Sequence, residues 1–389
     1  MPTRLLTATF NRFFESEKAG GLFLLIATSI SVALTNSPLG PQYLDFWQTS
    51  FAGLTLEHWV NDALMAIFFL MIGLELEREL YVGELSVLRN ALLPIFAALG
   101  GMAVPALLHY LFNSGLPTQP GVGIPMATDI AFALGALALL GARIPASLKV
   151  FVVAFAVIDD LGAIVMIALF YTDTVSLHYL AGSLGIWVAL LAMNRFFRIA
   201  TLPIYLIGGA LMWVLMLKSG IHATIAGVML AFAIPFWTAD NAQHSPSHQL
   251  ENSLHKPVAF LVLPIFALAN TGIVVGTSWL ADLSGPNAMG VIGGLVIGKP
   301  LGVVLLSFIA VMLGMCSLPP DLRWRHLVGA GMLGGIGFTM SIFITNLAYA
   351  DQPELINASK MSVFAASLMA GMLGFLWLRF FGLRETAPN

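Results

Sequence analysis

Apolar stretches separated by short polar breaks follow one another along almost the whole chain. Several approach the roughly 20 residues that an α-helix needs to cross the hydrocarbon core of a bilayer. Dividing the chain at its polar breaks predicts about twelve membrane-spanning helices in one integral membrane domain over residues 1–389. Their approximate ranges are 12–36, 58–81, 94–114, 121–142, 149–171, 177–194, 203–217, 221–237, 253–276, 287–314, 326–349 and 357–381. The pattern therefore predicts an all-α polytopic membrane protein embedded in a lipid bilayer.

Charged residues are too scarce for a soluble protein. They make up 10% of the chain, against 58% apolar residues, whereas a soluble globular domain has roughly 25% charged residues. The sequence has no basic patch of the kind that binds nucleic acid. The first apolar block follows a segment that contains Glu15 and Glu17, which favours a retained first span over a cleaved signal peptide. The single cysteine, Cys316, excludes an internal disulfide.

The distribution of basic residues predicts the orientation of the spans. When the polar breaks are assigned to alternating sides, 14 of the 17 lysines and arginines fall on one side. Only Lys218 and Lys360 fall on the other, and Lys299 lies inside a span. Because basic residues gather on the cytoplasmic side, the sequence predicts that both termini are cytoplasmic. The outer loop at about 41–57 partly alternates apolar with polar residues, and either a short hairpin or an irregular loop fits this pattern.

Two of the predicted spans contain helix-breaking residues in one half. The fourth reads GVGIPMATDIAFALG, and the eleventh reads GAGMLGGIGFTMSIF. An unwound segment inside a bilayer survives only where it is buried in protein or lines a wet cavity, and its free carbonyls are potential cation ligands. The alternative is that these glycines only allow close packing of regular helices.

The positions of these two spans favour the first interpretation. They are the middle members of spans 3–5 and spans 10–12, and the first member of each triplet contains a proline, Pro105 or Pro300. Weak internal symmetry with paired interrupted helices is typical of secondary transporters built from inverted-topology repeats. The sequence therefore predicts a transporter with two discontinuous helices. It does not predict an enzyme.

Four charged residues, Asp129, Asp159, Asp160 and Lys299, lie well inside predicted spans. Each charge costs roughly 2.5 to 3.5 kcal/mol at mid-bilayer, so a purely structural role is a poor explanation for all four. Two carboxylates about 4 Å apart repel by about 4 kcal/mol at an effective dielectric constant near 20. Such a pair holds protons until the pH rises or a cation replaces them. The Thr128 hydroxyl and free carbonyls could add cation ligands.

Competition between protons and a cation for one acidic site predicts exchange of one for the other. If two protons leave for one monovalent cation, the cycle moves net charge and is electrogenic. Lys299 has two possible roles, as a permanent counter-charge or as a proton carrier whose pKa is lowered by burial. The sequence does not separate these roles, and it gives no indication of a cofactor.

At these residues the chain resembles the NhaA-type sodium/proton antiporters of bacterial inner membranes. The resemblance covers nearly the whole chain and depends on NDALMAIFFLMIGLELERE, ATDIAFALGALALLG, AFAVIDDLGAI, KSGIHATIAGV, VIGKPLG and GIGFTMSIFI. It implies a core bundle at about 94–171 and 287–381 beside interface spans at about 12–81 and 177–276. It also implies pH-dependent exchange of intracellular Na⁺ or Li⁺ for external H⁺, in homodimers joined partly through the 41–57 loop.

The resemblance assigns roles to individual residues. Asp159 and Asp160 would bind the ion and the protons, with Thr128 near the cation. Asp129 would balance the positive helix ends at the two broken spans, and Lys299 would balance the negative ends or pair with Asp159. The positions associated with pH response are Glu75, Arg78, Glu79, His222 and Glu251.

Two departures from the family pattern concern the pH-sensing region. Asn252 stands where a histidine is common, and Glu77 stands where a basic residue is common. The resemblance therefore does not specify the pH at which exchange begins, whereas it does specify the exchange chemistry. A sodium-coupled symporter of an organic solute is the main alternative function. An intramembrane aspartyl protease is disfavoured because the G-x-G-D motif is absent.

Overall fold

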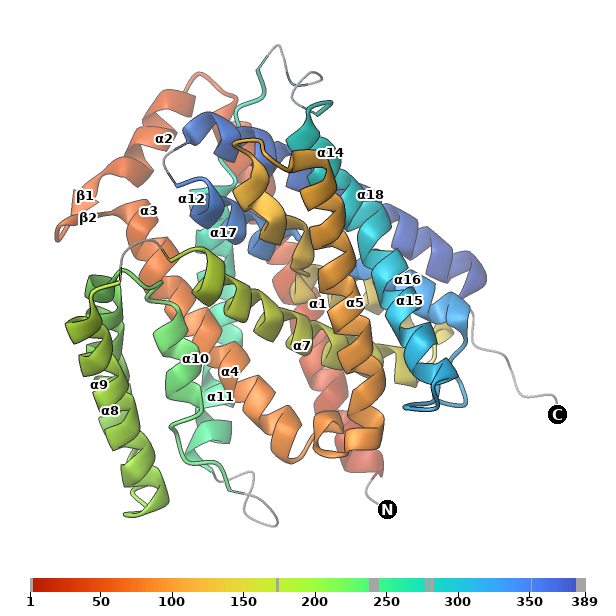
Figure 1. Ribbon diagram of the computed structural model, residues 1–389, viewed down its shortest axis with the longest axis horizontal. Helices are drawn as coiled ribbons and strands as arrows, with labels where there is room; N and C mark the ends of the chain where they lie inside the picture. Colours follow the sequence, from red (N-terminus) through yellow and green to blue (C-terminus); the bar gives the residue numbers. More distant parts are fainter. Residues whose placement is uncertain are drawn as a thin grey trace. The chain divides into compact units, whose positions relative to one another are not determined.

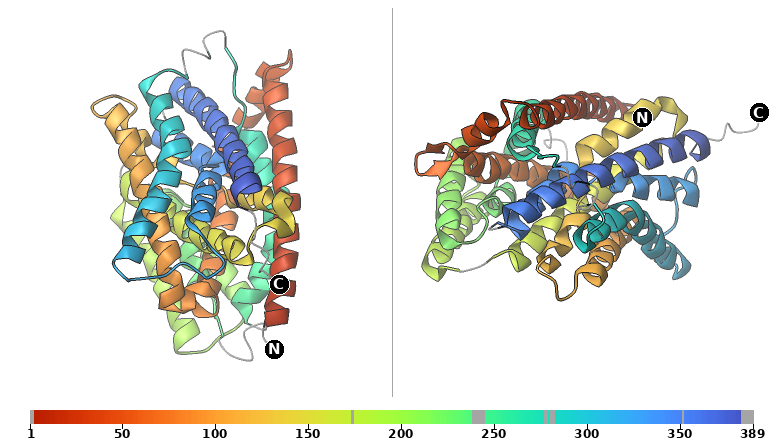
Figure 2. Two further views of the ribbon diagram at one scale, coloured as in Figure 1. Left: turned by 90° about the vertical axis from the view of Figure 1, so that its right-hand side faces the viewer. Right: turned by 90° about the horizontal axis from the view of Figure 1, so that it is seen from above.

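The helices of the chain group into two compact units (Figures 1 and 2). The computed structural model describes residues 3–172, 175–237, 245–276, 279, 283–350 and 352–382. The first unit comprises Met1–Asn36, Val87–Ala163 and Thr271–Asn389, and the second comprises Ser37–Ser86 and Ile164–Asn270. Both units are predominantly helical, which confirms the predicted all-α class.

The first unit contains the longest helices. Its elements are α1 (Thr3–Thr35), α5 (Leu88–Asn113), η3 (Gln119–Met126), α6 (Ile130–Leu140), η4 (Gly141–Arg143), most of α7 (Ala146–Phe170), α14 (Pro286–Gly293), η7 (Gly294–Gly298), α15 (Lys299–Met312), α16 (Trp324–Gly334), α17 (Phe338–Ala348) and α18 (Pro353–Phe381).

Helices α5 and α15 lie side by side in this unit (Figure 1). Gly100 and Gly302 form their closest approach: a Cβ on either glycine would lie 2.0 Å from the carbonyl oxygen of the other. Small residues let helix backbones approach in this way, and the van der Waals contact then drives association inside a bilayer. The pair α5 and α15 therefore forms a rigid support for Lys299, which begins α15.

Helix α1 packs against α6 within the first unit. A Cβ on Gly21 would lie 3.1 Å from the Ala131 carbonyl oxygen, so the two backbones are close. The expected division, which put residues 12–36 with the interface spans, stays a prediction. The pattern of apolar residues indicates that α1 spans a membrane but carries no information on which helices surround it.

The second unit contains the shorter elements. They are α2 (Gly40–Gln48), β1 (Ser50–Phe51), β2 (Leu54–Thr55), α3 (Leu56–His58), η1 (Trp59–Leu64), α4 (Met65–Tyr81), η2 (Glu84–Ser86), the end of α7 from Ile164, α8 (Leu177–Arg195), α9 (Leu202–Ser219), α10 (Ile225–Ala231), α11 (Pro246–Pro257), η6 (Val258–Val262) and α12 (Leu263–Asn270). Helices α8 and α9 lie side by side (Figure 1).

The described part of the chain has nine helices that are long and apolar enough to cross a bilayer, or up to 11 if each of two bent helix pairs counts as one span. The protein is therefore a multi-pass membrane protein. This range is consistent with the expected count of about twelve. The predicted span 221–237 is not among the helices that are long enough to cross a bilayer.

Residues 221–237 do not form a full span. Helix α10 covers only Ile225–Ala231, seven residues, or about 10 Å of helix, against a hydrocarbon core of about 30 Å. Gly220 ends α9 with a positive φ of 84°, and turns flank α10 on both sides. A Cβ on Gly227 would lie 2.2 Å from the Ala66 carbonyl oxygen, so α10 packs closely on α4. Apolar composition alone does not reveal these turns.

The loop at 41–57 contains the short hairpin that its alternating pattern allowed. Strands β1 and β2 pair antiparallel, with Ser50 opposite Thr55 and Phe51 opposite Leu54. Their two connecting residues, Ala52 and Gly53, have φ values of 51° and 87°, as a tight primed turn requires. The preceding residues form helix α2, which the sequence pattern did not predict.

Candidate functional site

A helix interruption in the first unit follows the 3₁₀ segment η3. The segment ends at Met126, and α6 begins at Ile130, so residues 127–129 lie outside regular helix. Pro125 lacks a backbone N–H and disfavours α-helical geometry in the residue before it. The glycine- and proline-rich half of the predicted fourth span thus lies immediately before this interruption.

A second interruption separates α16 from α17. Helix α16 ends at Gly334, α17 begins at Phe338, and the two helices are bent by 48°. A Cβ on Gly335 would lie 2.2 Å from the Leu295 carbonyl oxygen. Only glycine fits so close to another backbone, so the glycine-rich sequence at this bend reflects the packing around it.

Hydrogen bonds join the two interruptions directly. The Asp129 backbone N–H donates to the Ile336 carbonyl at 2.6 Å, and the Thr128 hydroxyl donates to the Gly334 carbonyl at 2.8 Å. Polar backbone groups that leave regular helix need such partners, because no water is available inside a bilayer. The two breaks therefore satisfy part of each other's hydrogen-bonding capacity.

The Asp129 carboxylate caps two helices at once. Its Oδ1 accepts from the Phe132 N–H of α6 at 3.1 Å. Its Oδ2 accepts from the Thr339 N–H of α17 at 3.0 Å and from the Thr339 hydroxyl. The first N–H groups of a helix carry partial positive charge. A buried carboxylate at the starts of two helices is therefore stabilised by both.

Lys299 and Asp159 form a fully buried ion pair. The Lys299 ammonium lies 2.9 Å from Asp159 Oδ1 and 2.7 Å from Oδ2, and both side chains are 0% exposed. The ammonium also donates to the Met126 carbonyl, beside the first interruption. Thr128 lies beside the Asp159 carboxylate. An ammonium has three protons. The two Asp159 oxygens and the Met126 carbonyl oxygen can accept all three.

Asp160, the next residue on α7, is also buried, with 1% of its surface exposed. Its charge acts on the Lys299 ammonium. Successive residues of a helix point about 100° apart, so the Asp159 and Asp160 side chains leave the same turn of α7 in different directions. The first unit thus contains all five of these residues: Thr128, Asp129, Asp159, Asp160 and Lys299.

Four of the residues expected to respond to pH meet in the second unit, at the end of α4. Arg78 is the centre of this group: its Nε lies 2.8 Å from Glu251 Oε1, and its terminal nitrogens lie 3.2 Å from Glu79 and 3.7 Å from Glu75. The His248 Nδ1 lies 3.2 Å from the other Glu251 oxygen. We call these five residues the Arg78 cluster.

Glu77 and His222 take separate places in the second unit. Glu77 is buried and accepts a hydrogen bond of 2.7 Å from the Ser247 hydroxyl of α11. His222 follows α9, and its Nε2 lies 2.7 Å from the Tyr171 carbonyl. His222 interacts electrostatically with Asp62. Asp62 lies 13 residues before Glu75, a distance of about 20 Å along the helix. The structure therefore does not place His222 with the Arg78 cluster.

Sequence reasoning missed His248 and Ser247 as partners in this region. Both lie in the first turn of α11, which Ser245 caps by accepting from the His248 N–H at 3.3 Å. The signal was available: His248 precedes Glu251 by three residues, the spacing of neighbours on one helix face.

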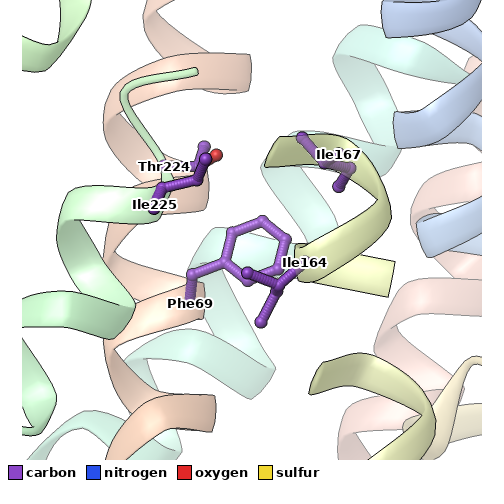
Figure 3. A pocket seen from close by; sticks show the side chains of 5 residues that line it. All are labelled: Phe69, Ile164, Ile167, Thr224 and Ile225. Carbon is purple, nitrogen blue, oxygen red and sulfur yellow. The ribbon is translucent and has the colours of Figure 1, made fainter. Parts of the chain in front are cut away.

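A small apolar gap lies between α4, α7 and α10 in the second unit (Figure 3). Its lining residues are Phe69, Ile164, Ile167, Thr224 and Ile225. Figure 3 shows Phe69 and Ile164 facing each other, with the Thr224 hydroxyl as the single oxygen among the labelled side chains. One hydroxyl supplies too few oxygens for a dehydrated alkali ion, so this gap is not a cation site by itself.

Known proteins resemble this chain along nearly its full length. The family model described as "Na+/H+ antiporter 1" matches residues 11–378. A Na(+)/H(+) antiporter NhaA of Dechloromonas aromatica is 65% identical over 376 residues, covering 97% of both chains. One of Flavobacterium johnsoniae is 57% identical over 96% of this chain and 97% of its own. One of Mesorhizobium japonicum is 47% identical over 94% of this chain and 93% of its own.

Proposed function

The chain belongs to the Na+/H+ antiporter 1 family, and from this premise we propose that it exchanges Na⁺ for H⁺ at Asp159 and Asp160. Its relatives are named as transporters and not as enzymes. The observation that carries the proposal is the buried ion pair between Asp159 and Lys299, with Asp160 beside it. A structural pair rarely needs a second buried carboxylate, because each added charge is costly in a membrane.

The charges of the site support competition between a cation and protons. With both carboxylates ionised and Lys299 protonated, these three side chains carry one net negative charge. This negative charge attracts a sodium ion and protons alike, and both need the same carboxylate oxygens. Hard cations prefer oxygen ligands, which Asp159, Asp160 and the Thr128 hydroxyl would supply. Li⁺ has the same preference, so we propose it as a second substrate.

Electrogenic exchange follows if more than one proton leaves for each Na⁺. The site has three groups that can hold protons, namely two carboxylates and one ammonium. Binding of Na⁺ to Asp159 would require its oxygens to turn from the Lys299 ammonium toward the ion. We propose that Lys299 then stays charged and compensates the carbonyl ends of the broken helices, because the Met126 carbonyl oxygen already contacts it.

Asp129 is proposed to compensate the positive starts of α6 and α17. Its two carboxylate oxygens accept hydrogen bonds from both helices, so neither oxygen is directed to a bound cation in this arrangement. We therefore separate Asp129, as a charge-compensating residue, from Asp159 and Asp160, as the residues that bind the transported ions.

The Arg78 cluster is proposed to set the pH response. Three carboxylates share one guanidinium, and His248 adds a group that can be neutral or charged. A histidine near a carboxylate is a common pH-dependent contact. Because the cluster joins α4 to α11, its protonation state would change how firmly these helices are held together. His222 would act separately, near Asp62.

Several wider features complete the proposal. The protein would lie in the bacterial inner membrane with both termini in the cytoplasm, as its basic residues suggest. It would form homodimers through the hairpin of the 41–57 loop, where Phe46 and Phe51 are 55% and 65% exposed. The organic solute symporter is not favoured, because no relative cited above is named as a symporter.

Sodium-induced alkalinisation in everted membrane vesicles tests the proposed exchange. Vesicles with the wild-type chain should show it at alkaline pH with no organic solute present, and Asp160→Asn should abolish it because the substitution removes one buried negative charge. Asp45→Asn, the same chemical change at an exposed position of α2, is the matched control and should behave as wild type. Full activity of Asp160→Asn would contradict the proposed site.

A further inference from the structure

The 3₁₀ segment η3 depends on side chains of α17 and of Tyr349 for some of its hydrogen bonds. Its geometry does not provide the regular α-helical pattern of backbone bonds. The Ser341 hydroxyl donates to the Ile124 carbonyl at 2.7 Å, and the Tyr349 hydroxyl donates to the carbonyl of Thr118, the residue before η3, at 2.7 Å. One end of η3 is therefore attached to α17, and the other is attached to Tyr349, the residue that follows α17.

The residues packed around Tyr349 leave space for its hydroxyl group. The side chain is 1% exposed, and its oxygen also lies 3.1 Å from the Asn287 side-chain oxygen on α14. A Cβ on Gly121 of η3 would lie 2.0 Å from the Tyr349 oxygen. Glycine at this position therefore leaves room for the hydroxyl. Phenylalanine would fill almost the same volume but would leave the Thr118 carbonyl without this donor.

The far end of η3 reaches the ion pair. Met126 is its last residue, and the Met126 carbonyl accepts from the Lys299 ammonium that also binds Asp159. A 3₁₀ segment of eight residues is about 16 Å long. A shift where it begins, at Thr118, would therefore move the carbonyl that holds Lys299.

We propose that Tyr349 is a positioning residue for cation exchange. By fixing the start of η3, its hydroxyl sets the position of the Met126 carbonyl, the acceptor that holds the Lys299 ammonium when Asp159 turns toward Na⁺. Tyr349 itself does not touch the transported ion. The inference rests on the proposed Na⁺/H⁺ exchange and adds a residue that the charge pattern of the sequence does not reveal.

A purely structural role for Tyr349 is the alternative, and Tyr205 provides a matched comparison. Tyr205 is 0% exposed, and its hydroxyl donates to the Ile199 carbonyl at 2.7 Å in the second unit. Tyr205→Phe and Tyr349→Phe thus remove the same kind of hydrogen bond, from a buried tyrosine to a carbonyl, and should lower thermal stability similarly. Only Tyr349→Phe should change the ion site.

The test measures exchange against Na⁺ concentration and against pH in everted vesicles that contain the full chain. Loss of one buried hydrogen bond lowers the population of molecules whose site is arranged to bind Na⁺ by about five-fold. Tyr349→Phe should therefore raise the half-saturating Na⁺ concentration about five-fold, while the maximal rate stays within about two-fold of wild type. At a fixed low Na⁺ concentration its pH profile should move to more alkaline pH, because protons compete better with a weakly bound cation. Tyr205→Phe should leave both quantities unchanged.

Two further variants keep the inference testable if Tyr349→Phe accumulates poorly. Ser341→Ala removes the α17 bond to η3 and should raise the half-saturating Na⁺ concentration in the same direction. Gly121→Ala should displace the Tyr349 hydroxyl, because a Cβ there would lie 2.0 Å from it, and should raise the half-saturating Na⁺ concentration in the same direction. A wild-type half-saturation and pH profile in Tyr349→Phe, or an equal change in Tyr205→Phe, would overturn the positioning role. Absence of exchange in the wild type would instead overturn the proposed function.

Discussion

At the residue scale, Lys299 is the centre of the site. Its ammonium contacts both oxygens of Asp159 and the Met126 carbonyl, and the side chain is fully buried. A neutral amine has only two protons to donate, so this set of three acceptors fits the charged form better. The geometry thus supports the counter-charge role over the proton-carrier role in the arrangement described here.

Substitutions of Lys299 distinguish these two roles. Arginine stays protonated at all relevant pH values, so Lys299→Arg should keep measurable exchange if a permanent charge is enough. Lys299→Gln leaves Asp159 without its partner cation, which costs about 3 to 5 kcal/mol when a buried pair is broken. It should therefore lower the melting temperature of the purified protein.

The matched control for these variants is Lys218→Gln, at an exposed position at the end of α9. It should change neither exchange nor melting temperature. Complete loss of exchange in Lys299→Arg, with a wild-type melting temperature, would show instead that this side chain must release a proton.

Sequence reasoning identified the buried charges but not all their partners. Asp159, Asp160 and Lys299 were predictable because each is costly inside a membrane. The choice of Asp159, and not Asp129, as the partner of Lys299 depends on how the helices are rotated, which no local pattern specifies. The polar stretch around His248 contains few apolar positions, so no apolar pattern indicates the helix that places it beside Glu251.

At the element scale, glycine contacts decide how closely the helices of the first unit pack. Gly100 of α5 and Gly302 of α15 each lie against the backbone of the other helix. Helix α15 begins at Lys299, so this crossing lies less than one turn from the buried ammonium. The separation of α5 and α15 therefore bears directly on the ion pair.

Gly302→Ala should destabilise the protein and weaken exchange. The new Cβ would lie 2.0 Å from the Gly100 carbonyl oxygen, and overpacking of this kind costs about 1 to 3 kcal/mol. Gly293→Ala in α14 is the control, because a Cβ there meets nothing within 4 Å. It should be neutral or slightly stabilising, since alanine favours helix over glycine by about 1 kcal/mol. Equal melting temperatures for the two variants would contradict the close-packing argument.

Helices and strands were predicted best where the residue pattern within the element itself was strong. Runs of apolar residues predicted the long helices well, and glycine- and proline-rich stretches coincide with the ends of η3 and α16. Helix α10 was overestimated because the turns beside it are apolar. The alternating pattern at 41–57 indicated the hairpin but gave no sign that α2 precedes it, since short helices depend on tertiary contacts.

At the scale of the whole molecule, the ion pair and the Arg78 cluster belong to different units. Helix α7 connects them along the chain: it carries Asp159 and Asp160 in the first unit and continues into the second at Ile164. Alternating access requires the surroundings of a fixed site to change. The acidic pair thus lies within about one and a half turns of the point at which its helix passes from one unit to the other.

The central claim is that Na⁺ and protons occupy the same acidic site in turn. Calorimetric titration of the purified protein with Na⁺, from about pH 6 to about pH 9 and in buffers of different ionisation enthalpy, measures affinity and proton release together. If the claim holds, the dissociation constant should fall with rising pH, by about tenfold per pH unit for each proton displaced, and Na⁺ binding should release protons. Asp160→Asn should lose this dependence. A dissociation constant that is the same at every pH, with no protons released, would contradict the account.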